Sequence, residues 1–385
     1  MIRYITTTSN GVKILFTGGG TAGHIFPIIA IARELRKLGL DAKFFYFGPQ
    51  DEFSSIFLSQ EGIEVKWVIS GKIRRYLGLQ SIGQNIIDVL FKIPIGCVQA
   101  FFRVFALAPD LIFSKGGYGS LPTVLAGQIL QVPIILHESD VVPGLANRFM
   151  SKFAHQVFVA FPEAQTEYFH EEKMIAVGNP VRQELLNGDK DKAKQYFNLI
   201  GQRPLLLIMG GSQGAQVIND LILAILPEIL TEFEIVHQTG SKHLDQLKAE
   251  AKVVADKELT KYYHPIGFLK EIELRDALKA CDLVVSRAGS GSIFEIAACG
   301  KPSILIPLSI SAQNHQIKNA YAYAQNKAAI VVEEANLTPR FFLEKVKYLF
   351  ANPDEMVKMS QRAKEFSRPD SAKIIAQYII NYSVK

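Results

Sequence analysis

The sequence has few cysteines and no large excess of either charge, and both shortages limit the kind of protein it encodes. Its three cysteines, Cys97, Cys281 and Cys299, are far apart and lack C-x-x-C spacing, which argues against a disulfide framework or a zinc site. We expect each to be a small buried hydrophobic residue. The 42 basic residues nearly balance the 37 acidic ones, so the composition does not indicate a general nucleic-acid binder.

The sequence also has little that resembles a targeting or membrane-spanning segment. Its first residues, MIRYITTTSNG, lack the apolar core of a secretory signal, and we expect a short leader and a reducing, cytoplasmic setting. The longest apolar segment, 81–107, is interrupted too often for a comfortable span of about 20 residues. The interrupting residues are Asp88, Lys92, Pro94, Gln99 and Arg103. This segment is either a core helix or a surface that contacts an anionic bilayer.

Basic and aromatic residues next to this segment keep the bilayer alternative open. Such residues beside exposed apolar side chains form a plausible contact with anionic lipids. The candidate membrane patch consists of Arg74, Arg75, Lys92, Phe101, Phe102 and Arg103.

The most informative segment is 13–39, KILFTGGGTAGHIFPIIAIARELRKLG, which predicts a strand, a glycine turn and a helix. The strand is expected at 12–16, with Pro27 in the first turn of the helix and Gly39 at its end. Such a turn directs free backbone N–H groups outward and can bind phosphate or another anion. Because His24 lies at the same point, the segment suggests chemistry as well as binding.

The turn also fits the dinucleotide pattern G-x-G-x-x-G through Gly18, Gly20 and Gly23. That pattern requires an acidic residue about 20 positions later, at the end of the second strand. The second strand, expected at 42–47, is followed by Gly-Pro-Gln, and Asp51 comes too late. A nicotinamide or flavin site is therefore disfavoured.

Glycine turns after apolar strands recur at 114–120, 210–215 and 287–292. Continuous apolar strands that alternate with helices are typical of parallel sheets covered on both faces. We therefore expect an α/β protein with two Rossmann-like parallel-sheet domains that face a central cleft. The expected domains are 1–180 and 181–365, with a C-terminal helix at 366–385 that packs back toward the first.

Asp189-Lys190-Asp191 formally matches the D-x-D pattern that holds a metal-bound sugar nucleotide in some glycosyltransferases. The triplet lies in a charged run that opens a helix, so helix capping is the preferred interpretation.

Taken together, the motifs resemble one family closely. In chain order they are GGGTAGH, KGGYGSLP, HESDVVPGLANR, GNPVR, GGSQGA, SRAGSGSIFEIAACGKPSILIPL and QIKNA, from position 18 to position 320. The same order is found in the MurG family of N-acetylglucosaminyltransferases of peptidoglycan synthesis.

The resemblance implies a GT-B fold and inverting transfer of N-acetylglucosamine from UDP-N-acetylglucosamine to the 4-hydroxyl of MurNAc in lipid I, which gives lipid II. It implies metal-independent catalysis without a cofactor, and peripheral attachment at the cytoplasmic face of the plasma membrane. Cell-wall or division proteins would be its partners, with roles in cell shape and the cell cycle. No nucleic acid is expected as a partner.

Several positions match donor contacts of the family. Ser212 and Gln213 lie in a glycine-rich turn and can supply donors to the diphosphate. By resemblance, Glu295 binds the ribose hydroxyls, the backbone at Leu269 reads uracil, and Gln316 contacts the sugar. The remaining candidates for this site are Thr21, Ala22, Gly23, Asp140, Arg182, Ser290, Gly291, Ser292, Ile293 and Phe294.

On the acceptor side, His24 is the first candidate for the general base. A helix N-terminus disfavours imidazolium, so the ring should be neutral and able to accept a proton. His24 could instead only orient the acceptor, and Glu138, at the end of an apolar strand, is the rival base. Asp140 departs from the amide that many members have, and an acid cannot donate the hydrogen bonds of an amide.

Three other functions fit the same motifs. The chain could be a GT-B glycosyltransferase with another lipid acceptor, or a non-hydrolysing UDP-N-acetylglucosamine epimerase that needs no lipid. It could also be a silent scaffold that binds sugar nucleotide, although intact candidate residues in both halves argue against that.

Overall fold

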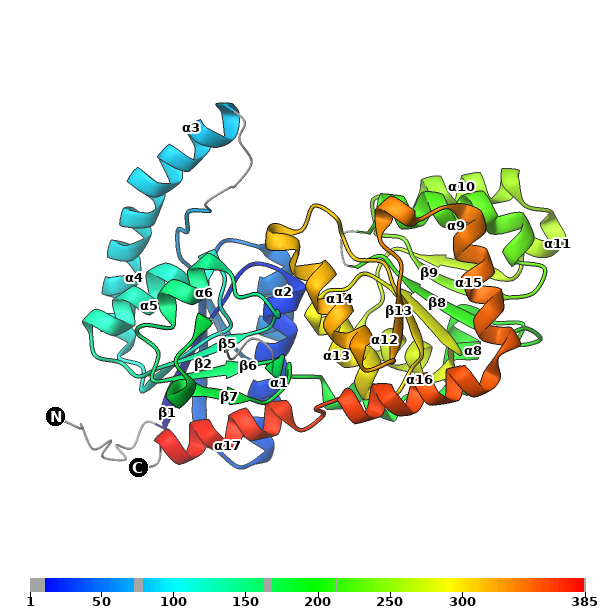
Figure 1. Cartoon of the computed structure of the whole chain (residues 1–385). Coiled ribbons are helices and arrows are strands. Elements are labelled where there is room, and N and C mark those ends of the chain that lie inside the picture. The colour runs from blue at the N-terminus through cyan, green and yellow to red at the C-terminus, as the bar shows by residue number, and fades with distance from the viewer. Residues whose placement is uncertain (1–10, 73–78, 163–167, 212–213, 384–385) are drawn as a thin grey trace. The chain divides into compact units, whose positions relative to one another are not determined.

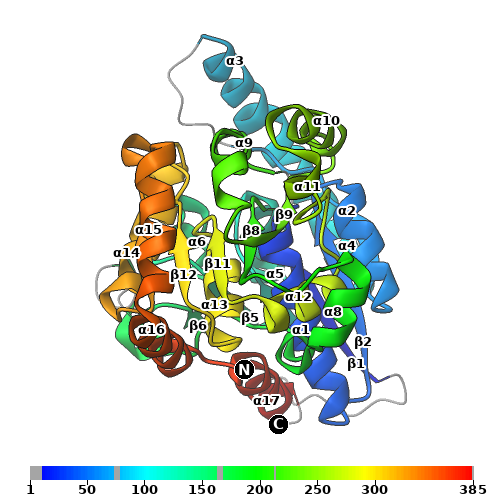
Figure 2. The ribbon, with the colours of Figure 1, turned by 90° about the vertical axis from the view of Figure 1, so that its right-hand side faces the viewer.

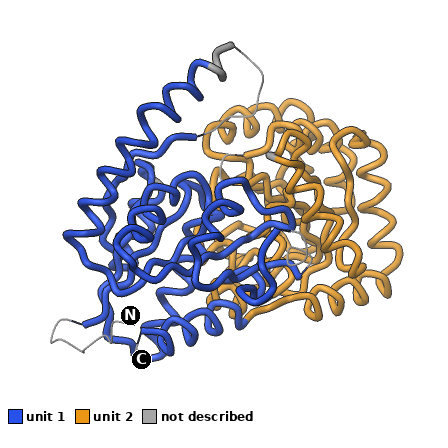
Figure 3. The backbone as a smooth tube through the Cα atoms, turned by 60° about the vertical axis from the view of Figure 1, so that its left-hand side comes forward, with its two compact units in different colours: residues 1–181, 370–385 blue, residues 182–369 orange. Residues whose placement is uncertain are grey.

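A computed structural model describes residues 11–72, 79–162, 168–211 and 214–383. The chain divides into two compact units: unit 1 comprises 1–181 and 370–385, and unit 2 comprises 182–369 (Figure 3). Each unit is built on its own parallel sheet.

Unit 1 contains a seven-stranded parallel sheet with the order β3-β2-β1-β4-β5-β6-β7. Its strands are β1 (Val12–Thr17), β2 (Ala42–Gly48), β3 (Glu64–Trp67), β4 (Leu111–Ser114), β5 (Ile134–Glu138), β6 (Gln156–Val159) and β7 (Met174–Ala176). Strand order reverses between β1 and β4, so the turns that follow these two strands lie next to each other. Ligands bind at such switch points in open α/β sheets.

Helices cover both faces of this sheet because successive strand residues point to opposite sides. Ile14 and Phe16 pack with one group of helices, and Leu15 packs with the other. The first group is α1 (Ala22–Lys37), α2 (Glu52–Gln60) and α17 (Ser371–Ser383) (Figure 1). The second group is α4 (Ile93–Leu107), α5 (Leu121–Ile129) and α6 (Leu145–Met150).

Helix α1 begins earlier than the sequence predicts. The amides of His24 and Ile25 both donate to the carbonyl of Thr21, at 2.8 and 3.2 Å, so the first turn closes well before Pro27. The expectation of Pro27 in the first turn was wrong, because the glycine turn allows the chain to enter the helix sooner. The end was predicted correctly: Gly39 follows the helix with φ of 81°, a conformation that suits glycine.

The apolar segment 81–107 forms most of α3 (Leu79–Ile87), a π-helical turn (Asp88–Lys92) and α4, which extend from unit 1 in Figure 1. One face of this stretch is apolar and exposed, with exposed fractions of 62% for Leu90, 64% for Phe102 and 66% for Phe105. Within the described residues, 83–107 is the one helical stretch with the length and hydropathy of a membrane span. By sequence alone, the residues that interrupt 81–107 disfavour a membrane span for this segment.

Three polar residues of this stretch hold the segment 67–72 against it. Arg103 donates to the carbonyl of Trp67, and the Gln99 side chain accepts from the amide of Ile69 at 2.9 Å. Asp88, only 2% exposed, accepts from the amide of Lys72 at 3.1 Å. Three of the residues that interrupt the apolar run in sequence, Asp88, Gln99 and Arg103, are therefore packing anchors, whereas Lys92 and Pro94 are exposed.

Unit 2 contains a six-stranded parallel sheet with the order β10-β9-β8-β11-β12-β13, whose middle strands are seen in Figure 2. Its strands are β8 (Leu205–Met209), β9 (Glu234–Gln238), β10 (Tyr263–Ile266), β11 (Leu283–Ser286), β12 (Ser303–Leu305) and β13 (Ala329–Val331). Its helices are α8 (Lys190–Phe197), α9 (Gln216–Ile229), α10 (Leu244–Val254), α11 (Lys257–Thr260), α12 (Glu271–Ala280), α13 (Ser290–Ala298), α14 (His315–Gln325), α15 (Pro339–Ala351) and α16 (Pro353–Phe366).

Two further sequence expectations can be compared with these elements. Asp189 is the N-cap of α8, where its side chain accepts from the amides of Asp191 and Lys192, so the capping interpretation of the D-x-D triplet is confirmed. Cys281 is buried as expected, whereas Cys97 and Cys299 are only half-buried.

The close contact of α4 with segment 67–72 predicts opposite effects for two glycine substitutions. A Cβ added to Gly96 would lie 1.9 Å from the carbonyl oxygen of Ile69, whereas one added to Gly83 in α3 would meet nothing within 4 Å. We expect Gly96→Ala to destabilise the protein by about 1–3 kcal/mol. Gly83→Ala, the matched control, should stabilise it by about 0.5–1 kcal/mol. Denaturant unfolding measures both, and equal effects would contradict the packing described.

Candidate active site

The first glycine turn of unit 1 is fixed from the neighbouring strand by Tyr46. This tyrosine of β2 is fully buried, and its hydroxyl donates to the carbonyls of Gly18 and Gly19, at 3.1 and 3.3 Å. Asp51, which came too late for a ribose, instead caps α2 by accepting from the amide of Ser54 at 2.8 Å. The turn is therefore held in one shape, and the acidic residue nearby has a structural role.

The imidazole of His24 packs between two glycines from different turns. A Cβ added to Gly19 would lie 2.9 Å from its Cε1 atom, and one added to Gly117 would lie 3.0 Å from its Nε2 atom. Thr21, the N-cap of α1, forms a 2.8 Å hydrogen bond with Nδ1. When Nδ1–H donates in this bond, the lone pair of Nε2 is the one that can accept a proton.

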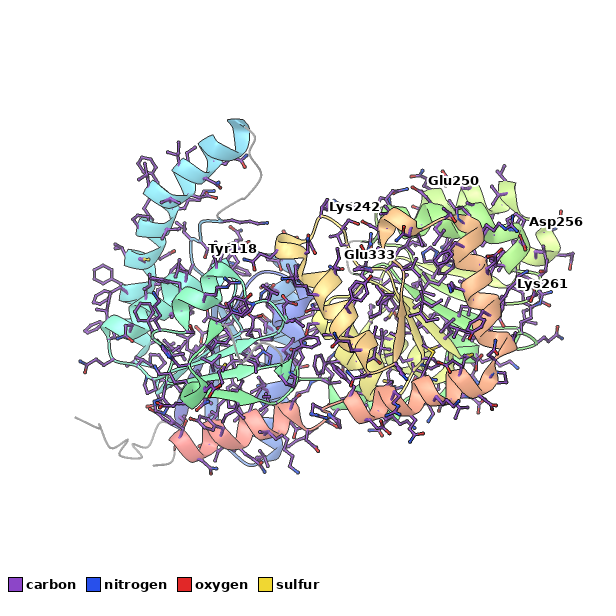
Figure 4. The ribbon with its side chains drawn as sticks, viewed as in Figure 1. Tyr118, Lys242, Glu250, Asp256, Lys261 and Glu333 are labelled. Carbon is purple, nitrogen blue, oxygen red and sulfur yellow. The ribbon has the colours of Figure 1, made fainter. Side chains whose placement is uncertain are left out.

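Glu138, the last residue of β5, is the centre of a buried hydrogen-bond network. One carboxylate oxygen accepts from the amide of Asp140 at 2.9 Å, and the other accepts from the side chain of Asn147 at 2.6 Å. Asn147 in turn accepts from the amide of Gly117 at 3.0 Å, so the network reaches the turn that borders His24. Tyr118, labelled in Figure 4, follows this turn.

The two candidate bases differ in protonation and in access. Burial and, to a smaller extent, the charge of Lys115 together lower the pKa of His24 to about 4, although Asp140 opposes the shift. His24 is half-buried and neutral near pH 7. Burial raises the pKa of Glu138, and Asp140 adds to the rise. Glu138 is only 3% exposed and both of its oxygens are engaged, so His24 is the more accessible proton acceptor.

In unit 2, Arg182 and Glu295 form a buried ion pair. The guanidinium of Arg182 is 3% exposed and contacts one oxygen of Glu295 at 2.7 Å through Nη2 and at 3.1 Å through Nε. Its Nη1 atom lies 3.5 Å from Glu271 at the start of α12. Arg182 therefore orients the carboxylate of Glu295 on α13.

Other donor candidates come after strands of the unit 2 sheet in the chain, and several are buried. The side chains of Ile293 and Phe294 are at most 1% exposed and Leu269 is 4% exposed, so only their main chain is available to a ligand. Ser290, at the start of α13, is 4% exposed, and its hydroxyl has no hydrogen-bond partner among the described residues. Gln316 accepts from the amide of Leu308 at 3.0 Å, which leaves its NH2 group as the donor.

The diphosphate candidates Ser212 and Gln213 lie outside the described residues, as do the membrane candidates Arg74 and Arg75. The turn on either side of Ser212 and Gln213 is described. Gly211 has φ of 87°, and a Cβ added to Gly214 would lie 2.3 Å from the carbonyl of Thr239.

Comparison with known proteins identifies the family to which these features belong. The glycosyltransferase family 28 N-terminal domain matches residues 14–159, and the C-terminal domain of the same family matches 205–375. A UDP-N-acetylglucosamine--N-acetylmuramyl-(pentapeptide) pyrophosphoryl-undecaprenol N-acetylglucosamine transferase of Clostridium tetani is 37% identical over 90% of this chain and 92% of its own. The second transferase of this name in Bacillus cereus is 38% identical over 95% and 99%.

The chain belongs to the MurG family of glycosyltransferases. Solved structures agree with its fold. A MurG of Acinetobacter baumannii aligns with a TM-score of 0.71 at 22% identity over 96% of this chain and 99% of that one. A UDP-GlcNAc 2-epimerase of Neisseria meningitidis aligns with a TM-score of 0.67 at 18% identity, over 96% of this chain and 100% of that chain. The predicted two-domain Rossmann-like architecture is therefore confirmed.

In this MurG-family chain, sequence reasoning missed the residues that organise the site in unit 1. Tyr46, Asn147 and Lys115 are all buried polar side chains, yet Tyr46 and Lys115 lie in or beside apolar strands, and Asn147 is one polar residue in a short helix. Lys115 and Asn147 belong to the motifs KGGYGSLP and HESDVVPGLANR, but only tertiary contacts show what their side chains do. Among the described residues, no group of three or more His, Cys, Asp or Glu side chains could hold a metal ion.

The hydrogen bond between Thr21 and His24 predicts a kinetic effect for this glycosyltransferase. Thr21→Val removes the partner that fixes the imidazole and its tautomer, so kcat should fall by about 2- to 10-fold, the worth of one neutral hydrogen bond. Thr231→Val is the matched control, because the Thr231 hydroxyl donates to a helix carbonyl in unit 2. A Thr21→Val enzyme with wild-type kcat would show that the bond does not position His24.

Proposed function

We propose that this protein transfers N-acetylglucosamine from UDP-N-acetylglucosamine to the 4-hydroxyl of the MurNAc unit of lipid I, with inversion, and so produces lipid II. The relatives named for this reaction are 36–38% identical over 90–95% of the chain. The single observation that carries the chemistry is His24, a half-buried imidazole, neutral near pH 7, beside two glycine turns. A neutral base is what deprotonation of a sugar hydroxyl requires.

In this proposal the reaction is a single displacement. Nε2 of His24 accepts the proton of the MurNAc 4-hydroxyl while the oxygen attacks C1 of N-acetylglucosamine. The bond between C1 and the phosphate oxygen breaks, and the electron pair leaves with UDP. One base and a site that stabilises the departing charge are sufficient, so no enzyme nucleophile is needed.

We assign the acceptor to unit 1 and the donor to unit 2. Arg182 contacts one oxygen of Glu295 and fixes the orientation of its carboxylate. In this proposal the carboxylate binds the ribose hydroxyls of the donor. The hydroxyl of Ser290 at the start of α13, which has no partner among the described residues, and the side-chain NH2 group of Gln316 are further contacts to the donor. Ser212 and Gln213 would serve the diphosphate at the N-terminal side of α9, as backbone N–H groups do at other helix starts.

The same assignment makes the reaction independent of metal ions. In this proposal backbone N–H groups and helix N-termini stabilise the diphosphate charge. Asp189, the first acid of the D-x-D triplet, caps a helix, and the proposal gives it no role as a metal ligand.

The experiment that tests the function combines purified protein, UDP-N-acetylglucosamine and a short-chain lipid I analogue. Formation of the disaccharide product with release of UDP is expected, at equal rates with and without EDTA. His24→Ala should lower kcat by about 10²- to 10⁴-fold, the usual contribution of a general base. The control His155→Ala removes an exposed histidine of unit 1 and should leave kcat unchanged. Conversion of the donor to its 2-epimer without transfer would instead identify an epimerase.

We further propose that the apolar face of α3, the π-helical turn and α4 contacts the cytoplasmic leaflet of the plasma membrane, where lipid I is embedded. Its exposed large side chains include Leu90, Phe91, Phe102 and Phe105, and such faces bind the headgroup–acyl boundary. Lys92 is half-exposed beside them and can meet anionic lipids. Peripheral attachment would also allow contact with cell-wall or division proteins.

Binding to liposomes tests this surface. The double variant Phe102→Ser/Phe105→Ser should lose most of its cosedimentation with anionic vesicles at every salt concentration, because it removes apolar area rather than charge. Its activity on a soluble, short-chain acceptor should persist. The control Val253→Ser/Ile272→Ser removes two exposed apolar residues of unit 2. Equal binding by both double variants would place the membrane contact elsewhere.

A further inference from the structure

Lys115, the residue after β4, is buried to an extent that is unusual for a lysine. Its exposed fraction is 1%, and lysines are almost never fully buried unless they are paired. Its amide donates to the carbonyl of Thr17 at the end of β1, at 2.8 Å. Its ammonium group donates to the hydroxyl of Ser139. The side chain thus joins the end of β4 to the turn that follows β5.

That turn carries two acidic side chains close together. Glu138 and Asp140 flank Ser139, and the amide of Asp140 donates to Glu138. Two neighbouring carboxylates oppose each other's ionisation, and the burial of Glu138 adds to the cost. The ammonium group of Lys115 donates to the residue between them and supplies a charge opposite to both carboxylates.

The same lysine adjoins His24. A Cβ added to Gly18 would lie 3.5 Å from Cβ of Lys115 and 3.3 Å from Cβ of His24, so the two side chains start on either side of one glycine. Gly117, which borders Nε2 of His24, follows Lys115 by two residues and is held by Asn147. Lys115 is therefore close to the imidazole of His24 in two ways: its side chain adjoins the same glycine, and its own turn borders the ring.

We propose that Lys115 is a positioning residue for the transfer reaction: its ammonium group balances Glu138 and Asp140 and, together with burial, keeps His24 neutral. The kinetic part of this inference rests on the proposed function. Lys115 is too buried to contact the acceptor, so it acts through the groups around it.

Electrostatic effects in the cluster agree with this arrangement. Burial lowers the pKa of His24 and of His137, the charge of Lys115 adds to both shifts, and Asp140 opposes the shift of His24. Burial lowers the pKa of Lys115, and Glu138 and Asp140 oppose that shift. On the β2 side, burial raises the pKa of Tyr46, and Asp51 and Tyr118 add to the rise.

The test is the pH profile of kcat for Lys115→Met. Removal of the positive charge raises the pKa of His24, and because the base must be neutral, the fall of kcat on acidification should begin at higher pH. A shift of about 1 pH unit or more is expected from the loss of one nearby charge. Lys115→Arg should restore the wild-type profile at least in part. The control Lys13→Met removes a lysine that donates to the carbonyl of Leu107, at the other end of the sheet, and should leave the profile unchanged.

A second variant keeps the inference testable if Lys115→Met does not fold. Asp140 is half-buried, and Asp140→Asn removes the charge that opposes Lys115, so the acid limb should move to lower pH. NMR titration of the His24 ring, assigned with His24→Gln, should show a lower pKa of His24 in Asp140→Asn than in the wild type, without any substrate. That readout separates this inference from the proposed function. An Asp140→Asn enzyme whose His24 titrates as in the wild type, or a folded Lys115→Met enzyme with an unshifted profile, would overturn it.

Discussion

The chemistry proposed for unit 1 depends on the close packing of one imidazole between two glycine turns. Gly19 and Gly117 come from turns that follow different strands, and neither position leaves room for a Cβ beside His24. The turns meet because parallel strands end at one edge of a sheet and because strand order reverses between β1 and β4. The hydroxyl of Tyr46 and the side chain of Asn147 then fix each turn from a neighbouring element.

In both units, buried ionic side chains are accompanied by opposite charges and by hydrogen bonds. Arg182 contacts Glu295 and Glu271 in unit 2, and in unit 1 the hydrogen bonds of Asn147 and Asp140 satisfy Glu138 while Lys115 supplies a positive charge. Buried ionic groups are costly unless each is paired and hydrogen-bonded. These networks fix the orientation of the candidate site residues, which suits the proposed reaction with its single oriented base and oriented donor.

Much of this fold could be predicted from the sequence, because its strands are continuous apolar runs followed by glycine turns. Local signals also located Gly39 at the end of α1 and Asp189 at the start of α8. The start of α1 was misjudged, since Pro27 is tolerated inside the helix. In segment 81–107 the inward role of Asp88, Gln99 and Arg103 was hidden, because their partners are main-chain atoms of segment 67–72. Lys115 was unrecognised for the same reason: its partners come from the turn after β5.

The central claim is that one neutral base and a stabilised leaving group perform the transfer in a single step. The most direct measurement is the anomeric configuration of the new linkage, read from the coupling constant of its anomeric proton by NMR in the product formed from the α-linked donor. A single displacement predicts a β linkage, the result of one inversion. An α linkage would require a second displacement and a covalent or equivalent intermediate, and would contradict the role of His24 as the base of a one-step transfer.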